Sequence, residues 1–220
     1  MRILHIAADY PDPLDNLKPT AIANLLSLAD NHENRVFSIN RIGWRSGIYA
    51  IDFADRNGPK HRAVVYPGMP KGLRFRYYLR ALADWIIADC RAAGFVPDLV
   101  QAHKMTVEGT VGRQVAAALG VPYALSIQGN TDLKILKARP DLQQHFRGIW
   151  HGAAVVFPFA VWARRGIESR LGERKGPTIQ MPCPGPADTM MAPEVTDKPV
   201  LRTAFNLHAA GVKNATGLIR

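Results

Sequence analysis

Short apolar runs alternate along this chain with longer stretches in which apolar residues recur every three or four positions. The first run, residues 3–7, predicts a buried strand that ends at the turn-rich segment 9–13. Pro19 and Thr20 then open a predicted helix whose apolar positions share one face. Further strands are predicted at 36–39, 63–66, 98–103, 122–127, 154–157 and 178–181, and further helices at 73–93, 107–119 and 160–171.

Two stretches between these elements are less regular. Residues 41–62 have no clean period and are interpreted as an excursion or a hairpin, and 132–150 holds one or two helices around Pro140. Roughly seven apolar strands separated mostly by helices favour a parallel sheet that is covered on both faces. The sequence therefore predicts a doubly wound α/β fold with three layers, α/β/α.

The pattern breaks near Cys183. Four prolines fall within 184–199, which is typical of an interdomain linker, and a new apolar run follows at 200–207. We therefore expect one domain over residues 1–183, a linker over 184–199, and the first part of a second domain over 200–220.

The charge balance points to an anionic partner. The chain carries 28 Lys and Arg against 18 Asp and Glu, a formal net charge of +10. Such a charge is compatible with a phosphorylated ligand, a nucleic acid or an acidic membrane. No nucleic-acid recognition motif accompanies it, so nucleic acid is the weakest of the three.

The cysteines and the apolar runs bear on localisation. Cys90 and Cys183 lie far apart, which provides no disulfide framework and favours a reducing cytoplasm. The apolar runs are too short for a signal-peptide core or a membrane span, so we expect a cytoplasmic protein that is at most peripheral to a membrane.

The basic residues are concentrated in one stretch. Residues 56–80 hold seven Lys or Arg and no acid, and aromatic residues accompany them at the start of the predicted helix 73–93. Such a helix can contact an anionic lipid surface or an anionic acceptor; the alternative is a core-facing helix with a solvated basic face. The candidates for that contact are Lys71, Arg74, Arg76 and Arg80.

Several common sites are missing from the sequence. No G-x-G-x-x-G follows the first strand, and neither a phosphate-binding G-x-x-x-x-G-K-[ST] loop nor a G-x-S-x-G elbow occurs. The seven histidines have no metal-ligand spacing. We therefore expect no bound metal and no nicotinamide or flavin cofactor.

Polar residues follow two predicted strands at the edge where a parallel sheet binds ligands. His103 ends one strand, where its ring could point into a cleft or instead cap the next helix. Segment 128–132 ends the next strand; Gly129 there permits close backbone approach and the following helix start attracts anions. The alternative is an ordinary turn in which Thr131 or Asp132 is the N-cap.

The order and spacing of several motifs resemble the N-terminal, acceptor-side domain of the family 4 retaining glycosyltransferases of the GT-B fold, which is Rossmann-like. The motifs are MRILHI with DYP at 1–11, PDLVQAH at 97–103, LGVPY leading into SIQGN at 119–130, QMPCPGPAD at 180–188, and K-N with L-I at 213–219.

The resemblance implies transfer of a sugar, with retention and without a metal, from a nucleoside-diphosphate sugar to a glycan, lipid or small-molecule acceptor. His103 would be the catalytic residue facing the sugar, and Lys213 would reach the donor diphosphate. The acceptor or cleft residues would be Asn16, Lys18, Lys104, Thr106, Glu108, Gln128, Gly129, Asn130 and Asp132.

This sequence departs from the family pattern at three places. Asn16 to Pro19 stand where many members carry Gly-Gly, Gln128 stands where they carry His, and Phe205-Asn206 stands where they carry Gly-Arg. The donor domain with its paired glutamates does not occur within the 220 residues. We therefore expect little or no transferase activity from this chain alone. The alternative is a standalone binding module for an anionic acceptor or a membrane surface.

Overall fold

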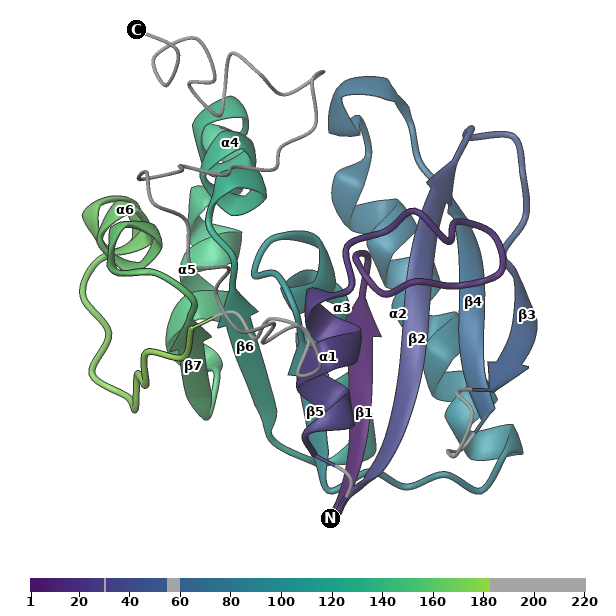
Figure 1. Cartoon of the computed structure of the whole chain (residues 1–220). Helices are drawn as coiled ribbons and strands as arrows, with labels where there is room; N and C mark the ends of the chain where they lie inside the picture. The colour runs from purple at the N-terminus through teal and green to yellow at the C-terminus, as the bar shows by residue number, and fades with distance from the viewer. Residues whose placement is uncertain (30, 55–59, 183–220) are drawn as a thin grey trace, which may run out of the picture. The chain divides into compact units, whose positions relative to one another are not determined.

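Seven strands form one sheet in the computed structural model, which describes residues 1–29, 31–54 and 60–182 (Figure 1). The strand order is β3-β4-β2-β1-β5-β6-β7, and every neighbouring pair is parallel except β3 and β4. The strands are β1 (Arg2–Ala7), β2 (Glu33–Ile42), β3 (Tyr49–Ala54), β4 (Lys60–Pro67), β5 (Leu99–Ala102), β6 (Tyr123–Ile127) and β7 (Val155–Pro158).

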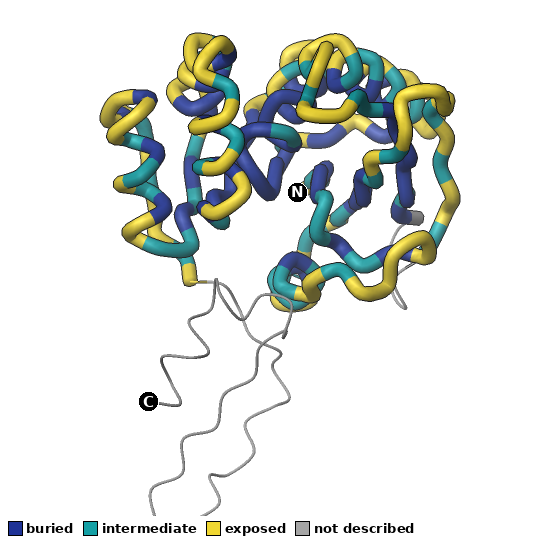
Figure 2. The backbone as a smooth tube through the Cα atoms, turned by 90° about the horizontal axis from the view of Figure 1, so that it is seen from above, coloured by how far each residue is buried: buried dark blue, intermediate teal, exposed yellow. Residues whose placement is uncertain are grey.

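Helices cover both faces of this sheet. In Figure 1, α1 (Ala21–Ser27) lies in front of the strands and α2 (Phe75–Ala92) lies behind them. The other helices are α3 (Val107–Leu119), α4 (Asn130–Ala138), α5 (Gln143–Gly152) and α6 (Val161–Leu171), with short 3-10 turns at Pro70–Gly72 and Pro140–Leu142. Figure 2 shows the buried stretches running inward and the exposed stretches on the outer loops and helix faces. The arrangement confirms the predicted α/β class.

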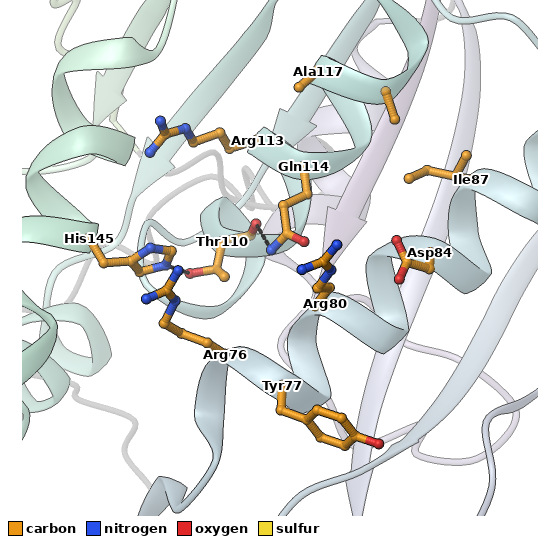
Figure 3. Close-up of a pocket in the computed structure, with 11 residues that line it drawn as sticks. Arg76, Tyr77, Arg80, Asp84, Ile87, Thr110, Arg113, Gln114, Ala117 and His145 are labelled. Carbon is orange, nitrogen blue, oxygen red and sulfur yellow. Dashed lines mark hydrogen bonds between the residues drawn. The ribbon is translucent and has the colours of Figure 1, made fainter.

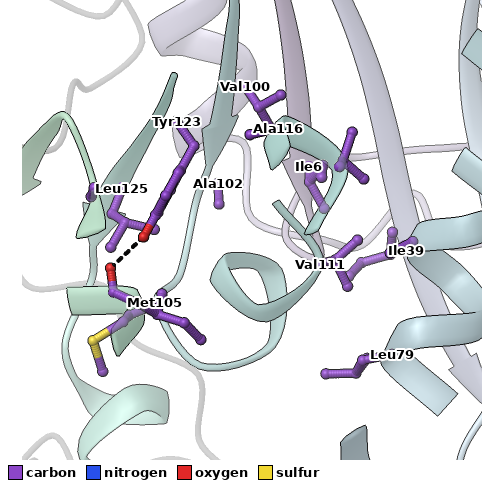
Figure 4. Close-up of a cluster of buried hydrophobic side chains, with 14 of the residues drawn as sticks. Ile6, Ile39, Leu79, Val100, Ala102, Met105, Val111, Ala116, Tyr123 and Leu125 are labelled. Atoms are coloured by element: carbon purple, nitrogen blue, oxygen red, sulfur yellow. Dashed lines mark hydrogen bonds between the residues drawn. The ribbon is translucent and has the colours of Figure 1, made fainter. Parts of the chain in front are cut away.

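The larger of two hydrophobic clusters joins the sheet to α2, α3 and α5. This cluster includes Ile6, Val100 and Leu125 of the central strands together with Val111 of α3 and Leu79 of α2 (Figure 4). The smaller cluster packs α1 against β1 and β2. Burial of each such side chain contributes about 1.5–3 kcal/mol, which explains why continuous apolar runs form the central strands.

Sequence and structure differ at the margins of the sheet. The predicted strand at 178–181 is confirmed only in part: Thr178 forms one parallel bridge with Val156, and the N–H groups of Ile179 and Met181 donate to the carbonyls of Val156 and Pro158. Pro158 of β7 has no N–H to return a bond, so the ladder does not extend beyond this bridge. The seventh strand is instead β3, from the irregular stretch 41–62, where the hairpin alternative is confirmed. Because β3 runs antiparallel to β4, the sheet is not wholly parallel.

The predicted linker at 184–199 and the predicted second-domain start at 200–220 lie outside the described residues. The proposed domain boundaries therefore stay predictions.

Candidate functional site

The direction in which the strands are added reverses at β1. The chain runs outward from β1 through β2 to one side, and outward from β5 through β6 and β7 to the other. In open parallel sheets, ligands bind beyond the carboxyl ends of the strands at such a switch point. The segments that follow β1 and β5, residues 8–18 and 103–106, are therefore the first place to look for a site.

A buried ion cluster occupies this position. Lys104 Nζ lies 2.7 Å from Asp9 Oδ1 and 3.9 Å from Glu108 Oε1, and the Ala8 N–H donates to Glu108 Oε1 at 3.1 Å. The loop after β1 is thus tied to the first turn of α3. Asp9 remains about one-quarter exposed, so the cluster has an open side.

Burial raises the pKa of Glu108 to about 7, against the opposing effect of the Lys104 ammonium. Burial alone would lower the pKa of Lys104, but Glu108 and Asp9 raise it above its ordinary value. Near neutral pH, Glu108 can therefore hold or release a proton, whereas Lys104 keeps its charge. Glu108 Oε2 is buried and has no hydrogen-bond partner among the described residues.

Asp132 connects α4 to the loop after β5. Its Oδ1 accepts from the N–H and the hydroxyl of Thr106, at 2.9 and 2.8 Å, and its Oδ2 accepts from the Met105 N–H at 3.2 Å. Burial raises the pKa of Asp132 despite these bonds. The carboxylate thus holds the loop that enters α3 and does not cap its own helix, which begins at Asn130 after Gly129. The N-cap alternative for Asp132 is wrong.

His103 faces another histidine. Its Nε2 lies 3.1 Å from His5 Nδ1, and His5 Nε2 lies 3.0 Å from Asn34 Oδ1. The amide nitrogen of Asn34 donates to backbone carbonyls, so its oxygen accepts from His5 Nε2–H. His103 Nε2–H then donates to His5, and the buried His103 Nδ1 is an acceptor with no described partner.

Both rings are neutral at pH 7. Burial lowers the pKa of His5 to about 4, and burial together with His5 lowers that of His103. The expectation that His103 points into an open cleft is wrong, because the residue is 0% exposed and its ring packs on His5. The capping alternative is equally wrong, since the ring donates to His5 and not to the backbone of α3.

The turn after β6 contributes polar groups to the same edge. Gln128 Nε2 donates to the His103 carbonyl at 3.2 Å, and Asn130 is exposed at the start of α4. Gly129 has φ +111°, and a Cβ there would lie 2.5 Å from Trp162 Cη2. The space that we expected to admit a ligand is thus occupied by the ring of Trp162 from α6.

A second cluster orders the loop after β1. Asp12 Oδ2 accepts from Lys18 Nζ at 2.7 Å, Ser38 Oγ at 2.5 Å and Asn40 Nδ2 at 2.9 Å. Burial alone would raise the pKa of Asp12, but these hydrogen bonds hold it below its ordinary value. Asn16 lies exposed in the same loop.

Asp12, Ser38 and Asn40 are not predicted as a group from the sequence. The signal that could have found them is their shared position at the carboxyl ends of β1 and β2. His5 and Asp9 are likewise missed, although each lies on or beside the first strand.

The basic residues before and within α2 are not among the hydrogen-bond or ion-pair partners of this edge cluster. Lys71 and Arg74 are exposed and have positive φ, +56° and +54°, at the entrance to α2. Arg76 and Arg80 line a groove on the outer side of α2. Within residues 1–29, 31–54 and 60–182, no helix is long and apolar enough to cross a membrane. The same residues contain no group of three His, Cys, Asp or Glu side chains that could hold a metal ion.

The switch-point cluster therefore offers hydrogen-bonding groups for a hydroxyl-rich ligand. Lys104 donates, Gln128 and Asn130 both donate and accept, and Glu108 exchanges a proton near neutral pH. Lys213 lies outside the described residues, so its expected contact with a donor diphosphate stays a prediction.

No family model matches the sequence, and no curated protein matches it. Solved structures do match. An α,α-trehalose-phosphate synthase (UDP-forming) from Burkholderia xenovorans, in complex with glucose-6-phosphate, gives a TM-score of 0.55 at 8% identity over 83% of this chain and 50% of that chain. Trehalose-6-phosphate from E. coli bound with UDP-2-fluoro glucose gives 0.52 at 6% identity, over 83% and 49%. The α,α-trehalose 6-phosphate synthase from Burkholderia multivorans gives 0.51 at 11%, over 82% and 48%.

The likeness confirms the predicted fold, a Rossmann-like domain of the kind found in GT-B glycosyltransferases. The chain spans about half the length of the solved structures it matches. These structures are trehalose-phosphate synthases, so they support the GT-B fold but not the resemblance to family 4 in particular.

Proposed function

We propose that this chain is the acceptor-side, N-terminal domain of a retaining glycosyltransferase that uses a nucleoside-diphosphate sugar. The observation that carries the proposal is the polar cluster at the switch point of a GT-B-type sheet, formed by Asp9, Lys104 and Glu108 beside Gln128. The similar structures add support, since one is UDP-forming and in complex with glucose-6-phosphate, and another is bound with UDP-2-fluoro glucose.

The roles follow from exposure. Asn130 and Gln128 are accessible and would hydrogen-bond acceptor hydroxyls, while the buried Lys104 would hold the partly exposed Asp9 carboxylate at the open side of the cluster. His103 lies behind them and is fully buried, so it would act by positioning: its carbonyl accepts from Gln128 and its ring donates to His5. Catalysis of this kind depends on positioning and electrostatic stabilisation more than on covalent chemistry of the protein.

The donor sugar, by this proposal, is bound by a second domain, to which Lys213 would contribute a contact with the diphosphate. The 220-residue chain alone would then bind acceptor and turn over little or no donor. We further propose that the protein works in the cytoplasm, without a metal or another cofactor.

The test is an NMR titration of the full chain with glucose-6-phosphate as acceptor probe, accompanied by a turnover assay with UDP-glucose. We expect shifts at Lys104, Gln128 and Asn130, and no turnover. The double variant Gln128→Ala/Asn130→Ala should lose at least about tenfold in the affinity that is read from the shift of Lys104. The matched variant Gln144→Ala, which removes an exposed amide from α5, should bind normally. Shifts confined to other regions, or sustained turnover by the chain alone, would contradict the proposal.

A second candidate, a membrane-binding module without catalysis, rests on the entrance to α2. Leu73 and Tyr77 are 60% and 67% exposed there, between Lys71, Arg74 and Arg76. Exposed apolar side chains flanked by cations can insert at an anionic lipid surface. Binding to phosphatidylglycerol vesicles that weakens from low to high salt would support this candidate, and equal binding to phosphatidylcholine vesicles would count against it.

A further inference from the structure

A groove lies between α2 and α3 on the face of these helices that is turned away from the sheet. It has a volume of about 880 Å³, and the first turn of α5 closes one side through His145 (Figure 3). Ile87, Ala117 and Ala118 give it apolar walls, and Tyr77 lies near the start of α2. The groove is distinct from the switch-point cluster, whose residues do not line it.

Three arginines extend into this groove from two helices. Arg76 and Arg80 are four residues apart, which places them on one face of α2, and Arg113 comes from α3. None of the three forms an ion pair with a carboxylate in the part of the chain that the structure describes. Asp84 is the single acid among the described residues that line the groove, so these residues carry a surplus of positive charge.

Two other arginines that contact α2 do form ion pairs with it. Arg35 and Arg62 both pair with Asp89, which lies on another face of α2 from the groove. The described residues thus include a carboxylate for the arginines that contact α2 from the sheet, and none within 4.0 Å of the arginines in the groove. A structural role as an ion-pair partner therefore does not explain Arg76, Arg80 and Arg113.

His145 lies among these cations. The hydroxyl of Thr110 donates to the Thr106 carbonyl, so it must accept from His145 Nε2–H at 3.1 Å. Burial, followed by the charges of Arg76 and Arg113, lowers the pKa of His145 to about 4. The charged groups around the ring are Arg76, Arg80 and Asp84 of α2 and Arg113 of α3. The ring is thus neutral at pH 7 and adds no charge to that of the arginines.

We propose that the groove between α2, α3 and α5 binds the phosphate group of a phosphorylated ligand, held by Arg76, Arg80 and Arg113. Guanidinium groups bind phosphate oxygens in bidentate pairs, and three of them around one groove neutralise a dianion. The groove is larger than a phosphate ion, so a sugar or glycerol carrying the phosphate fits beside Tyr77 and the alanine wall. This inference does not depend on the proposed transferase function.

The first experiment titrates the full chain with sulfate, whose charge is constant between pH 4 and 8, and then with inorganic phosphate and glucose-6-phosphate. We expect the variant Arg76→Gln/Arg113→Gln to lose at least about tenfold in affinity for each probe, read from the NMR shifts of the groove residues Gln114 and His145. The control variant Arg91→Gln/Arg165→Gln removes the same charge from exposed positions outside the groove and should change affinity less than about twofold. Matching far-ultraviolet spectra and thermal midpoints would show that all variants are folded.

The source of the phosphate is decided by two further arms. Binding of glucose-6-phosphate that requires the groove arginines identifies a soluble ligand. Vesicles of phosphatidic acid that require the same arginines, with no binding of the soluble probe, identify a lipid headgroup. Both results support the site. An equal loss in the groove and control variants, or no binding of any of the four probes, overturns it.

The pKa of His145 gives a second measurement, one that would not change if sulfate acted only on the overall charge of the protein. A bound anion offsets Arg76 and Arg113, so saturating sulfate should raise the pKa of His145 by about one unit or more in an NMR titration. The control variant should show the same rise, and the groove variant should not. An unchanged His145 pKa in saturating sulfate would also overturn the proposal.

Discussion

At the scale of single residues, the buried carboxyl of Glu108 should make the stability of the protein depend on pH. Its pKa is raised from 4.5 to about 7, so the folded state prefers the protonated form, whereas the unfolded chain releases the proton near pH 4.5. Stability is therefore lost as pH rises between these values. In Glu108→Gln this loss is absent. From pH 5 to pH 8 we expect the free energy of unfolding of the wild type to fall by roughly 2–3 kcal/mol relative to the variant, as measured by urea titrations.

The matched control is Glu173→Gln, which changes an exposed glutamate after α6. Its free energy of unfolding should follow the wild type at both pH values. Parallel pH profiles for wild type and Glu108→Gln would mean that the carboxyl ionises in the folded state as readily as in water. The sequence places Glu108 near the cleft but gives no sign of its burial, because the contacts with Ala8 and Lys104 join segments that come together only in the folded sheet.

At the scale of elements, two glycines at the ends of secondary structure differ in what their missing side chain permits. Gly120 ends α3 with φ +70°, and a Cβ added there would have no atom within 4 Å, whereas Gly129 has φ +111° and faces Trp162. Gly120→Ala should cost about 1 kcal/mol through backbone conformation alone. Gly129→Ala adds a steric clash of about 1–3 kcal/mol, so it should lower the thermal midpoint markedly more.

Equal effects of the two substitutions would show that α6 can move away from the turn without cost.

The comparison of the two glycines also indicates what a sequence can predict at the scale of elements. A glycine after an apolar helix is a local signal, and it correctly predicts the end of α3 at Leu119. The contact of Gly129 with Trp162 lies 33 residues along the chain and depends on how α6 packs after β7. No local pattern contains this contact, so the sequence alone predicts room for a ligand where the indole ring lies.

At the scale of the whole domain, predictability falls from the centre of the sheet to its edges. β1, β5 and β6 are buried on both faces and follow from continuous apolar runs. β3 has Tyr49 and Ile51 half-exposed and is paired on one side only, so its pattern is weak. The segment 178–181 has a strand-like composition, yet Pro158 in the neighbouring strand β7 lacks an N–H and limits the pairing to one bridge. A single sequence therefore predicts best those strands that are buried on both faces, because their apolar runs are continuous.

The decrease in burial from the centre of the sheet to its edges also predicts which strands open first. Amides of β1, which lies between β2 and β5 under both hydrophobic clusters, should exchange with deuterium only through global unfolding. Amides of β3 should exchange through local opening, because losing β3 breaks one ladder and exposes little apolar surface. In hydrogen-exchange measurements at increasing low denaturant, β3 should show a nearly flat dependence and β1 the full slope of unfolding. Equal free energies and slopes for both strands would mean that the hairpin is an integral part of the cooperative core.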